Sequence, residues 1–127
     1  MRRDYSAKVV EIFLNPANVG KMDNPDFYGK VTGSCGDTME IFLKTEKNLI
    51  TDSKFTTDGC GPSLVCGSMI TQLVKGKYIN EAGGITAEKV LDALGGLPEA
   101  DQHCAQLAED TLQKAITTYL KMKKGQV

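Results

Sequence analysis

The stretch around which the chain is organised is Asp58-Gly59-Cys60-Gly61-Pro62-Ser63-Leu64-Val65-Cys66-Gly67-Ser68-Met69-Ile70-Thr71-Gln72-Leu73-Val74-Lys75. It places Cys60 where an extended segment turns into a helix, and Pro62 suits the first helical position. Unpaired N–H groups and the helix dipole favour an anion there, so the pKa of the Cys60 thiol is expected below its ordinary value of about 8.5. A thiolate at this position would bind metal or attack sulfur. The alternative is a buried structural cysteine in a glycine-rich turn.

The residues after Cys60 have the best helical pattern in the chain. The predicted apolar stripe contains Val65, Cys66, Met69, Ile70, Leu73 and Val74. The opposite side contains Gly67, Ser68, Thr71, Gln72 and Lys75, and Gly76 ends the helix. We expect the apolar stripe to pack on a sheet. Cys66 lies within this stripe, so it is predicted to be a small core residue and not a ligand.

Three strands are expected before this helix, at Phe27–Ser34, Thr38–Lys44 and Leu49–Thr57. The middle strand has the clearest alternation of the three. One face carries Met39, Ile41 and Leu43, and the other carries Glu40, Phe42 and Lys44. The connections at 35–37 and 45–48 are short enough for hairpins, so the strands are predicted to form an antiparallel meander.

Helices are expected on either side of this sheet region. The first runs from Ser6 to Leu14, and the loop 15–26 follows it. Another has Thr86 as its N-cap and ends at Gly95-Gly96. The last runs from Asp101 to Lys121, with an inner face of Ala105, Ala108, Leu112, Ala115, Ile116, Tyr119 and Leu120. The sequence therefore predicts an α+β fold with a three-stranded antiparallel sheet covered by helices.

Length and composition limit the function classes. A chain of 127 residues is expected to form a single domain, residues 1–127, with one hydrophobic core. Lys and Arg total 15 and Asp and Glu total 16, so there is no basic field to bind nucleic acid. No membrane span or secretory signal is evident, so we expect a cytoplasmic protein. In that reducing compartment, four cysteines are more typical of metal ligands, reactive thiols or core residues than of disulfides.

Three of the cysteines lie at the ends of predicted elements. Cys35 is in a turn between strands, Cys60 precedes a helix, and Cys104 follows His103 in the first turn of the last helix. If these ends converge, the three thiols, the imidazole and the carboxylate of Asp37 would form a metal site. The separations are long and irregular, unlike the local pairs of a zinc finger. A solvated histidine without a ligand role remains the alternative for His103.

The same residues resemble the IscU/NifU-type iron–sulfur cluster scaffold proteins over nearly the whole chain. The matching motifs are Asn15-Pro16-Ala17-Asn18-Val19-Gly20, Ser34-Cys35-Gly36-Asp37, Gly59-Cys60-Gly61, Val74-Lys75-Gly76-Lys77, and His103-Cys104 followed by Leu107-Ala108-Glu109-Asp110. The resemblance implies that Cys35, Cys60 and Cys104 are the cluster thiolates, with Asp37 as a modulating carboxylate and His103 nearby. It also implies a three-stranded antiparallel sheet with helices packed on one face.

The resemblance further implies a carrier and not an enzyme. Such a protein accepts sulfur from a cysteine desulfurase, combines it with iron, holds a transient [2Fe–2S] cluster and transfers it to apo-proteins. The sequence leaves the oligomeric state of the cluster-bound form open, with a homodimer as one alternative. Three soft thiolates suit iron and sulfide, and a carboxylate or imidazole in the fourth position binds more weakly than a fourth thiolate. A weakly binding fourth ligand would make release of the cluster easier.

Two positions depart from the family pattern. Where many members of the IscU branch have Leu-Pro-Pro-Val-Lys, this chain has Leu97-Pro98-Glu99-Ala100-Asp101, which puts recognition by the branch's ATP-driven chaperone in doubt. Asp101 also fits an N-cap of the last helix. Cys66 stands where many members have alanine or a small hydroxyl residue.

Two other functions use the same residues. One is a zinc-bound sulfur acceptor or sulfurtransferase of the SufU type, although the SufU insertion between Cys60 and Cys104 is missing here. The other is a binding module in which zinc is purely structural. Cysteine, histidine and aspartate bind zinc and iron alike, so the sequence does not separate these functions from a cluster scaffold.

Overall fold

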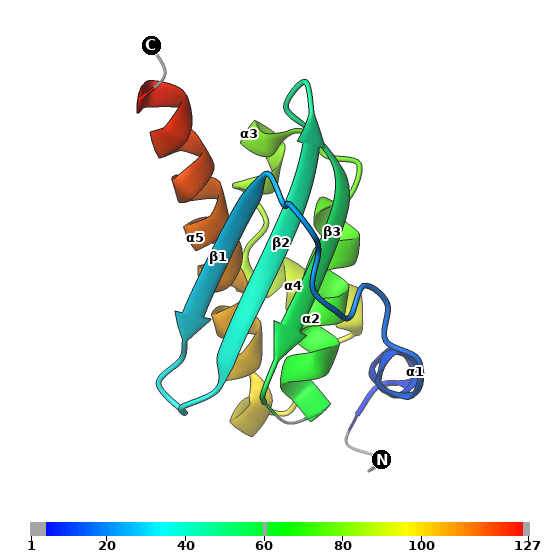
Figure 1. Ribbon diagram of the computed structural model, residues 1–127. Coiled ribbons are helices and arrows are strands. Elements are labelled where there is room, and N and C mark those ends of the chain that lie inside the picture. The colour runs from blue at the N-terminus through cyan, green and yellow to red at the C-terminus, as the bar shows by residue number, and fades with distance from the viewer. Residues whose placement is uncertain (1–4, 60, 126–127) are drawn as a thin grey trace.

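The chain folds into an antiparallel sheet with helices gathered on one of its faces (Figure 1). This computed structural model describes residues 5–59 and 61–125, with residues 119–125 described by their backbone alone. The elements in chain order are α1 (Ala7–Leu14), β1 (Phe27–Thr32), β2 (Thr38–Glu46), β3 (Leu49–Thr57), α2 (Gly61–Val74), α3 (Ile79–Ala82), α4 (Ala87–Leu94), the 3-10 turn η1 (Glu99–Asp101) and α5 (His103–Gly125). The predicted α+β class and the predicted three strands are confirmed.

The sheet has the strand order β1-β2-β3, and both pairs are antiparallel. The alternation predicted for β2 is confirmed, because Met39, Ile41 and Leu43 are all fully buried on the helix side. The β2–β3 hairpin turns at Lys47 and Asn48, which have φ values of 52° and 71°. Left-handed backbone at both positions matches the twist that a two-residue hairpin connection needs.

α5 packs against β1 at unusually close range. A Cβ atom on Gly29 would lie 2.5 Å from the backbone nitrogen of Ala115 and 2.6 Å from the carbonyl oxygen of Thr111. The absence of a side chain at Gly29 therefore lets the helix backbone lie directly on the strand. The predicted inner face of α5 is buried from Ala105 to Ile116. Tyr119 and Leu120 lie outside the residues whose side chains are described.

The prediction for α2 is wrong in one respect. Its apolar stripe is largely buried, but on the supposed outer side Gly67 is buried as well, and Ser68 and Thr71 are fully buried. A Cβ on Gly67 would lie 2.3 Å from the ring of Phe55, so this side of α2 faces β3. The polar side chains are accommodated because they form hydrogen bonds: the Ser68 hydroxyl accepts from Ala17 N at 2.9 Å, and the Thr71 hydroxyl donates to Gly67 O at 2.8 Å.

The segment between α1 and β1 runs beside the free edge of β3. Gly20 N donates to Phe55 O at 2.8 Å, and Phe55 N donates to Asn18 O at 2.9 Å, which makes an isolated parallel bridge at Val19. The side chain of Asn18 also donates to the Thr71 hydroxyl at 3.1 Å. Figure 1 shows the segment then passing in front of the sheet toward β1. The loop predicted for 15–26 is thus confirmed, and it is hydrogen-bonded to both β3 and α2.

The helix α4 and its cap are confirmed, since the Thr86 hydroxyl accepts from Lys89 N at 3.3 Å and Gly95 has φ 79°. The short elements α3 and η1 were not predicted. α5 begins at His103, and Gln102 precedes it, so the expected capping role of Asp101 is wrong. The carboxylate of Asp101 instead accepts a hydrogen bond from the Tyr5 hydroxyl at 2.6 Å.

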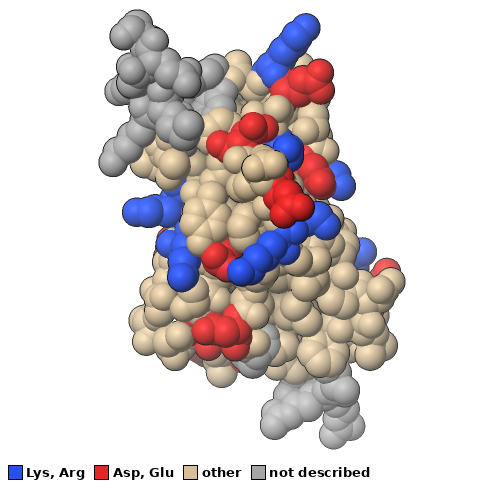
Figure 2. Space-filling view, in the orientation of Figure 1, with Lys and Arg blue, Asp and Glu red and all other residues tan. Residues whose placement is uncertain are grey.

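The open face of the sheet carries mixed charge. Figure 2 shows basic and acidic side chains interspersed on it, so this face has no basic field of the kind that binds nucleic acid.

The Tyr28 hydroxyl donates to the Glu40 carboxylate, which also accepts from the Thr56 hydroxyl at 2.8 Å. Burial, the Glu40 hydrogen bond and the Glu40 charge raise the pKa of Tyr28 to about 12. Hydrogen bonds from Tyr28 and Thr56 lower the pKa of Glu40.

Among residues 5–59 and 61–125, no helix combines the length and the apolar character that crossing a bilayer requires.

Candidate metal centre

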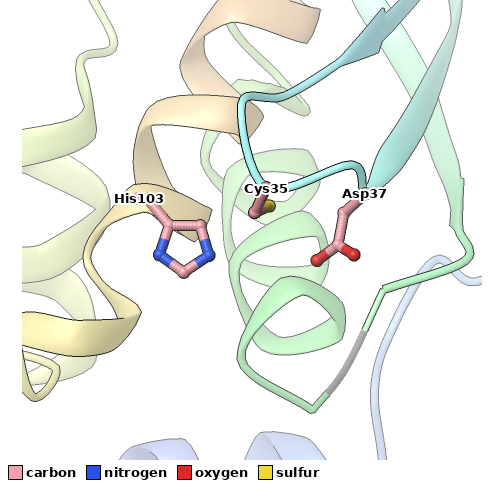
Figure 3. Close-up of side chains that lie close together, drawn as sticks. All are labelled: Cys35, Asp37 and His103. Carbon is pink, nitrogen blue, oxygen red and sulfur yellow. The ribbon is translucent and has the colours of Figure 1, made fainter.

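Two of the three predicted element ends meet at one end of the sheet (Figure 3). Cys35 and Asp37 lie on the turn between β1 and β2, and His103 is the first residue of α5. The turn is closed by hydrogen bonds from Gly36 N to Gly33 O at 3.0 Å and from Gly33 N to Asp37 O at 2.8 Å. These bonds fix the backbone that carries Cys35 and Asp37.

The side chains of Cys35, Asp37 and His103 point toward one another, and their ligand atoms all lie within 4.8 Å of one another (Figure 3). Ligand atoms around one tetrahedral metal ion lie roughly 3.5 Å apart, as follows from metal–ligand bonds of about 2.0–2.3 Å. Cys35 and His103 are exposed, so their side chains have room to close this difference. Imidazole, thiolate and carboxylate fit zinc and iron by their donor chemistry.

Cys104 lies deeper than this group. Its side chain is fully buried, and its sulfur is 3.6 Å from the Nε2 atom of His103. The sulfur is also 3.3 Å from the hydroxyl of Ser63, in the first turn of α2. The predicted site residue Cys104 is therefore adjacent to the exposed group through His103, although it is not one of the three ligand atoms within 4.8 Å.

Cys60, which precedes α2 in the sequence, lies outside the described residues. Its neighbour Gly59 is described, and a Cβ atom on Gly59 would lie 2.6 Å from Asp37 Oδ2 and 2.7 Å from Ser63 Oγ. The chain thus passes against Asp37 one residue before Cys60. Participation of Cys60 in the metal centre remains a prediction.

A small pocket opens on the outer side of the exposed group. It has a volume of about 90 Å³ and lies between the β1–β2 turn and α5. Its lining residues are Gly33, Ser34, Cys35, His103, Gln106, Leu107 and Asp110. Cys35 and His103 can therefore be approached from solvent on this side.

Ser63 belongs to this site, but the sequence reasoning did not identify it. Its hydroxyl donates to Asp37 Oδ2 at 3.1 Å and lies 3.3 Å from Cys104 Sγ. A signal was present, because Ser63 follows Cys60 by only three residues, in the first turn of the predicted helix. Cys66, by contrast, is fully buried in the core cluster, so its predicted core role is confirmed.

Comparison with known proteins identifies the family of this chain. Residues 4–126 match the profile of the NifU-like N terminal domain. The chain belongs to the NifU-like N-terminal domain family. The resemblance drawn from the motifs is therefore confirmed.

Curated relatives of this NifU-like domain are similar over almost the whole chain. It is 46% identical to "Iron-sulfur cluster assembly scaffold protein IscU 1" of Archaeoglobus fulgidus, over 97% of this chain and 80% of that protein. It is 42% identical to "Iron-sulfur cluster assembly scaffold protein IscU" of Haemophilus influenzae, over 95% of this chain and 98% of that protein.

Solved structures support the same fold. A NifU-like protein (N-terminal) from Brucella abortus has a TM-score of 0.71 at 20% identity, covering 93% of this chain and 95% of that one. A putative SUF-system scaffold from Fervidobacterium islandicum has a TM-score of 0.70 at 23% identity, covering 88% and 96%. At such identities the likeness concerns the fold alone. The predicted IscU/NifU-like fold is confirmed.

Proposed function

We propose that this NifU-like protein is a scaffold for iron–sulfur cluster assembly. It receives sulfur from a cysteine desulfurase and iron from a donor, holds a transient [2Fe–2S] cluster, and transfers the cluster to apo-proteins. Its relatives carry the name of cluster assembly scaffold proteins. It acts as a carrier, without turnover of a small substrate, and residues 1–127 act as one domain in the cytoplasm.

The observation that carries this proposal is the grouping of Cys35, Asp37 and His103 on a fixed turn and a helix start, with Cys104 beneath them. This group combines soft sulfur donors with a hard oxygen donor. Thiolates retain iron and sulfide, whereas a carboxylate is displaced more easily. A site that mixes the two is suited to holding a cluster and releasing it.

The candidate ligands differ in their exposure to solvent, and this difference suggests different roles for them. Cys35 and His103 are exposed beside the small pocket, so an incoming donor or acceptor protein reaches them first. Cys104 is fully buried and holds cargo away from solvent. When sulfur arrives from a persulfide, a cysteine thiolate attacks the terminal sulfur, the donor's S–S bond breaks, and the donor leaves as a thiolate. This attack leaves a persulfide on the accepting cysteine, and two electrons from a thiol reductant then cleave its S–S bond to give sulfide and the cysteine thiolate.

Anaerobic reconstitution tests the proposal. The full chain is incubated with ferrous iron, cysteine, a cysteine desulfurase and a thiol reductant, and visible absorption is recorded with and without the desulfurase. We expect desulfurase-dependent absorption of a [2Fe–2S] cluster, and transfer of that cluster to an apo-ferredoxin. Absence of a cluster in protein whose thiols are shown to be reduced would contradict the scaffold function.

The same experiment separates the zinc alternative. A zinc-bound sulfur acceptor of the SufU type would take up persulfide sulfur but remain colourless, with zinc as the bound metal. Metal analysis of the product, together with mass spectrometry of the cysteines, distinguishes the two functions. We expect iron and acid-labile sulfide in equal amounts.

A further inference from the structure

The hydroxyl of Ser63 joins two of the candidate ligands. Ser63 lies in the first turn of α2 and is fully buried. Its oxygen is 3.1 Å from Oδ2 of Asp37, on the β1–β2 turn, and 3.3 Å from Sγ of Cys104, on α5. One side chain thus contacts donors from two other segments at a point without solvent access.

The hydroxyl has limited freedom to move away from these partners. A Cβ atom on Gly59 would lie 2.7 Å from Oγ of Ser63 and 2.8 Å from Cβ of Ser63. The backbone at Gly59 therefore restricts the Ser63 side chain on one side. Asp37 and Cys104 occupy two further directions. A buried hydroxyl with polar partners is strongly favoured over one without them, because losing a partner leaves an unsatisfied buried group. The Ser63 side chain is therefore held in place.

A serine hydroxyl has one proton to donate and lone pairs that accept. The Ser63 hydroxyl lies within donor distance of both Asp37 Oδ2 and Cys104 Sγ, so its single proton is shared between two acceptors. The positions of the two ligands are thus coupled through one hydroxyl.

We propose that Ser63 is a positioning residue of the metal centre, which orients Asp37 and Cys104 for the same cargo and strengthens its retention. The inference rests on the proposed function, in that it takes Asp37 and Cys104 as ligands. Groups that hydrogen-bond to metal ligands fix ligand orientation, and their loss typically costs about 10–100-fold in metal affinity. Ser63 has this effect through Asp37 and Cys104, without binding the metal itself.

The test uses Co²⁺ as a spectroscopic probe of the full chain, titrated anaerobically into the wild type and Ser63→Ala. We expect Ser63→Ala to bind Co²⁺ about tenfold more weakly. We also expect a changed visible absorption of the bound ion, which reports the number and geometry of its ligands. Wild-type affinity together with a wild-type spectrum in Ser63→Ala would overturn the inference.

Ser68→Ala is the matched control, because it removes a fully buried hydroxyl from the same helix. The Ser68 hydroxyl bonds to Ala17 and Gln72, away from the candidate ligands. We expect this variant to bind Co²⁺ with the wild-type affinity and spectrum. An equal weakening in both variants would mean that the effect is general destabilisation, and would overturn the inference.

A double-mutant cycle with Asp37→Ala tests the coupling. If Ser63 acts through its partners, Ser63→Ala weakens Co²⁺ binding less when Asp37 is already absent. Fully additive effects would overturn the inference. Different results would contradict the scaffold function and the positioning role. A wild type that binds Co²⁺ but never assembles a cluster would contradict the scaffold function. Normal cluster assembly together with no effect of Ser63→Ala would contradict only the positioning role.

Discussion

At the scale of single residues, the cysteines differ in their surroundings. Cys35 is exposed on a turn, Cys104 is buried beside His103, and Cys66 is buried within the apolar core. We predict that Cys35→Ser, Cys60→Ser and Cys104→Ser each lose cluster assembly, because each removes a thiolate ligand. Cys66→Ala should assemble a cluster normally. Visible absorption after anaerobic reconstitution measures both outcomes, and loss of assembly in Cys66→Ala would contradict the assignment.

Asp37 supplies the oxygen donor of the site. A carboxylate is harder and more easily displaced than a thiolate, so we predict that Asp37→Ala slows transfer of the cluster to an acceptor apo-protein. Transfer kinetics of the wild type and the variant under one set of conditions measure the effect. Asp23→Ala, which changes an exposed aspartate of the α1–β1 segment, is the control. Equal transfer rates for Asp37→Ala and wild type would leave Asp37 as a turn residue.

The Tyr28–Glu40 pair predicts a signature at high pH. The pKa of Tyr28 is raised from 10.0 to about 12. An unfolded chain ionises this tyrosine near pH 10, so the pair's contribution to folding stability is complete below pH 10 and is lost as the pH rises to about 12. We predict that ultraviolet absorbance shows one tyrosine ionising at about pH 12 in the folded protein.

Three conservative variants check this assignment. Tyr28→Phe should remove the late ionisation, whereas Tyr78→Phe, which changes an exposed tyrosine, should retain it. Glu40→Gln removes the charge and weakens the hydrogen bond, so it should move the late ionisation to lower pH. An unchanged titration of Tyr28→Phe would show that another tyrosine is responsible.

At the scale of elements, regular patterns were predictable and close packing was not. The alternation in β2 and the capped helix α4 could be predicted because each follows from local sequence. The burial of Gly67 and Thr71 could not, because it depends on β3 and on the α1–β1 segment, which lie far away in sequence. The elements α3 and η1 are four and three residues long, too short to show a period.

The α2–β3 contact gives a stability prediction. A methyl group at Gly67 would collide with the fully buried ring of Phe55, so Gly67→Ala should lower the free energy of unfolding near the upper end of the ~1–3 kcal/mol typical of overpacking. Gly83→Ala is the control, since Gly83 is exposed with φ −62° and its nearest contact would be 3.9 Å away. That variant should be unchanged or stabilised by up to about 1 kcal/mol.

Urea unfolding at neutral pH measures both glycine variants. Comparable losses in Gly67→Ala and Gly83→Ala would contradict the close approach of α2 to β3. A loss confined to Gly67→Ala would support it.

At the scale of the whole molecule, the site depends on which element ends meet. The sequence predicted cysteines at element ends, and an antiparallel meander followed by a helix brings the Cys35 turn toward the start of α2. The depth of Cys104 and the bridging role of Ser63 could not be predicted, because both depend on how α2 and α5 pack together. Patterns place residues along elements, whereas the packing of elements decides which side chains touch.

The segment Leu97-Pro98-Glu99-Ala100-Asp101 leads to a prediction about partners. Its last three residues form the turn η1, and the Asp101 carboxylate accepts a hydrogen bond from Tyr5. A short peptide segment is recognised through complementary charge and preset backbone, and like-charge contacts typically cost several kcal/mol. We predict that cluster transfer does not depend on the ATP-driven chaperone of the IscU branch.

Transfer is measured with and without the chaperone, its J-domain partner and ATP. We expect no ATP-dependent acceleration for the wild type, and acceleration after the paired change Glu99→Pro and Asp101→Lys. Strong acceleration of the wild type would contradict the prediction.

The backbone between α1 and β1 also has a consequence for the behaviour of the protein in concentrated solution. β3 ends the sheet, and an uncovered outer strand is a template on which strands of other chains can add. Asn18 and Gly20 use the hydrogen-bonding groups of Phe55, and their φ values of 67° and 132° prevent the segment from continuing as a regular strand. It therefore occupies the strand edge at Phe55 without offering a new template, which hinders the addition of a strand from another chain at this point.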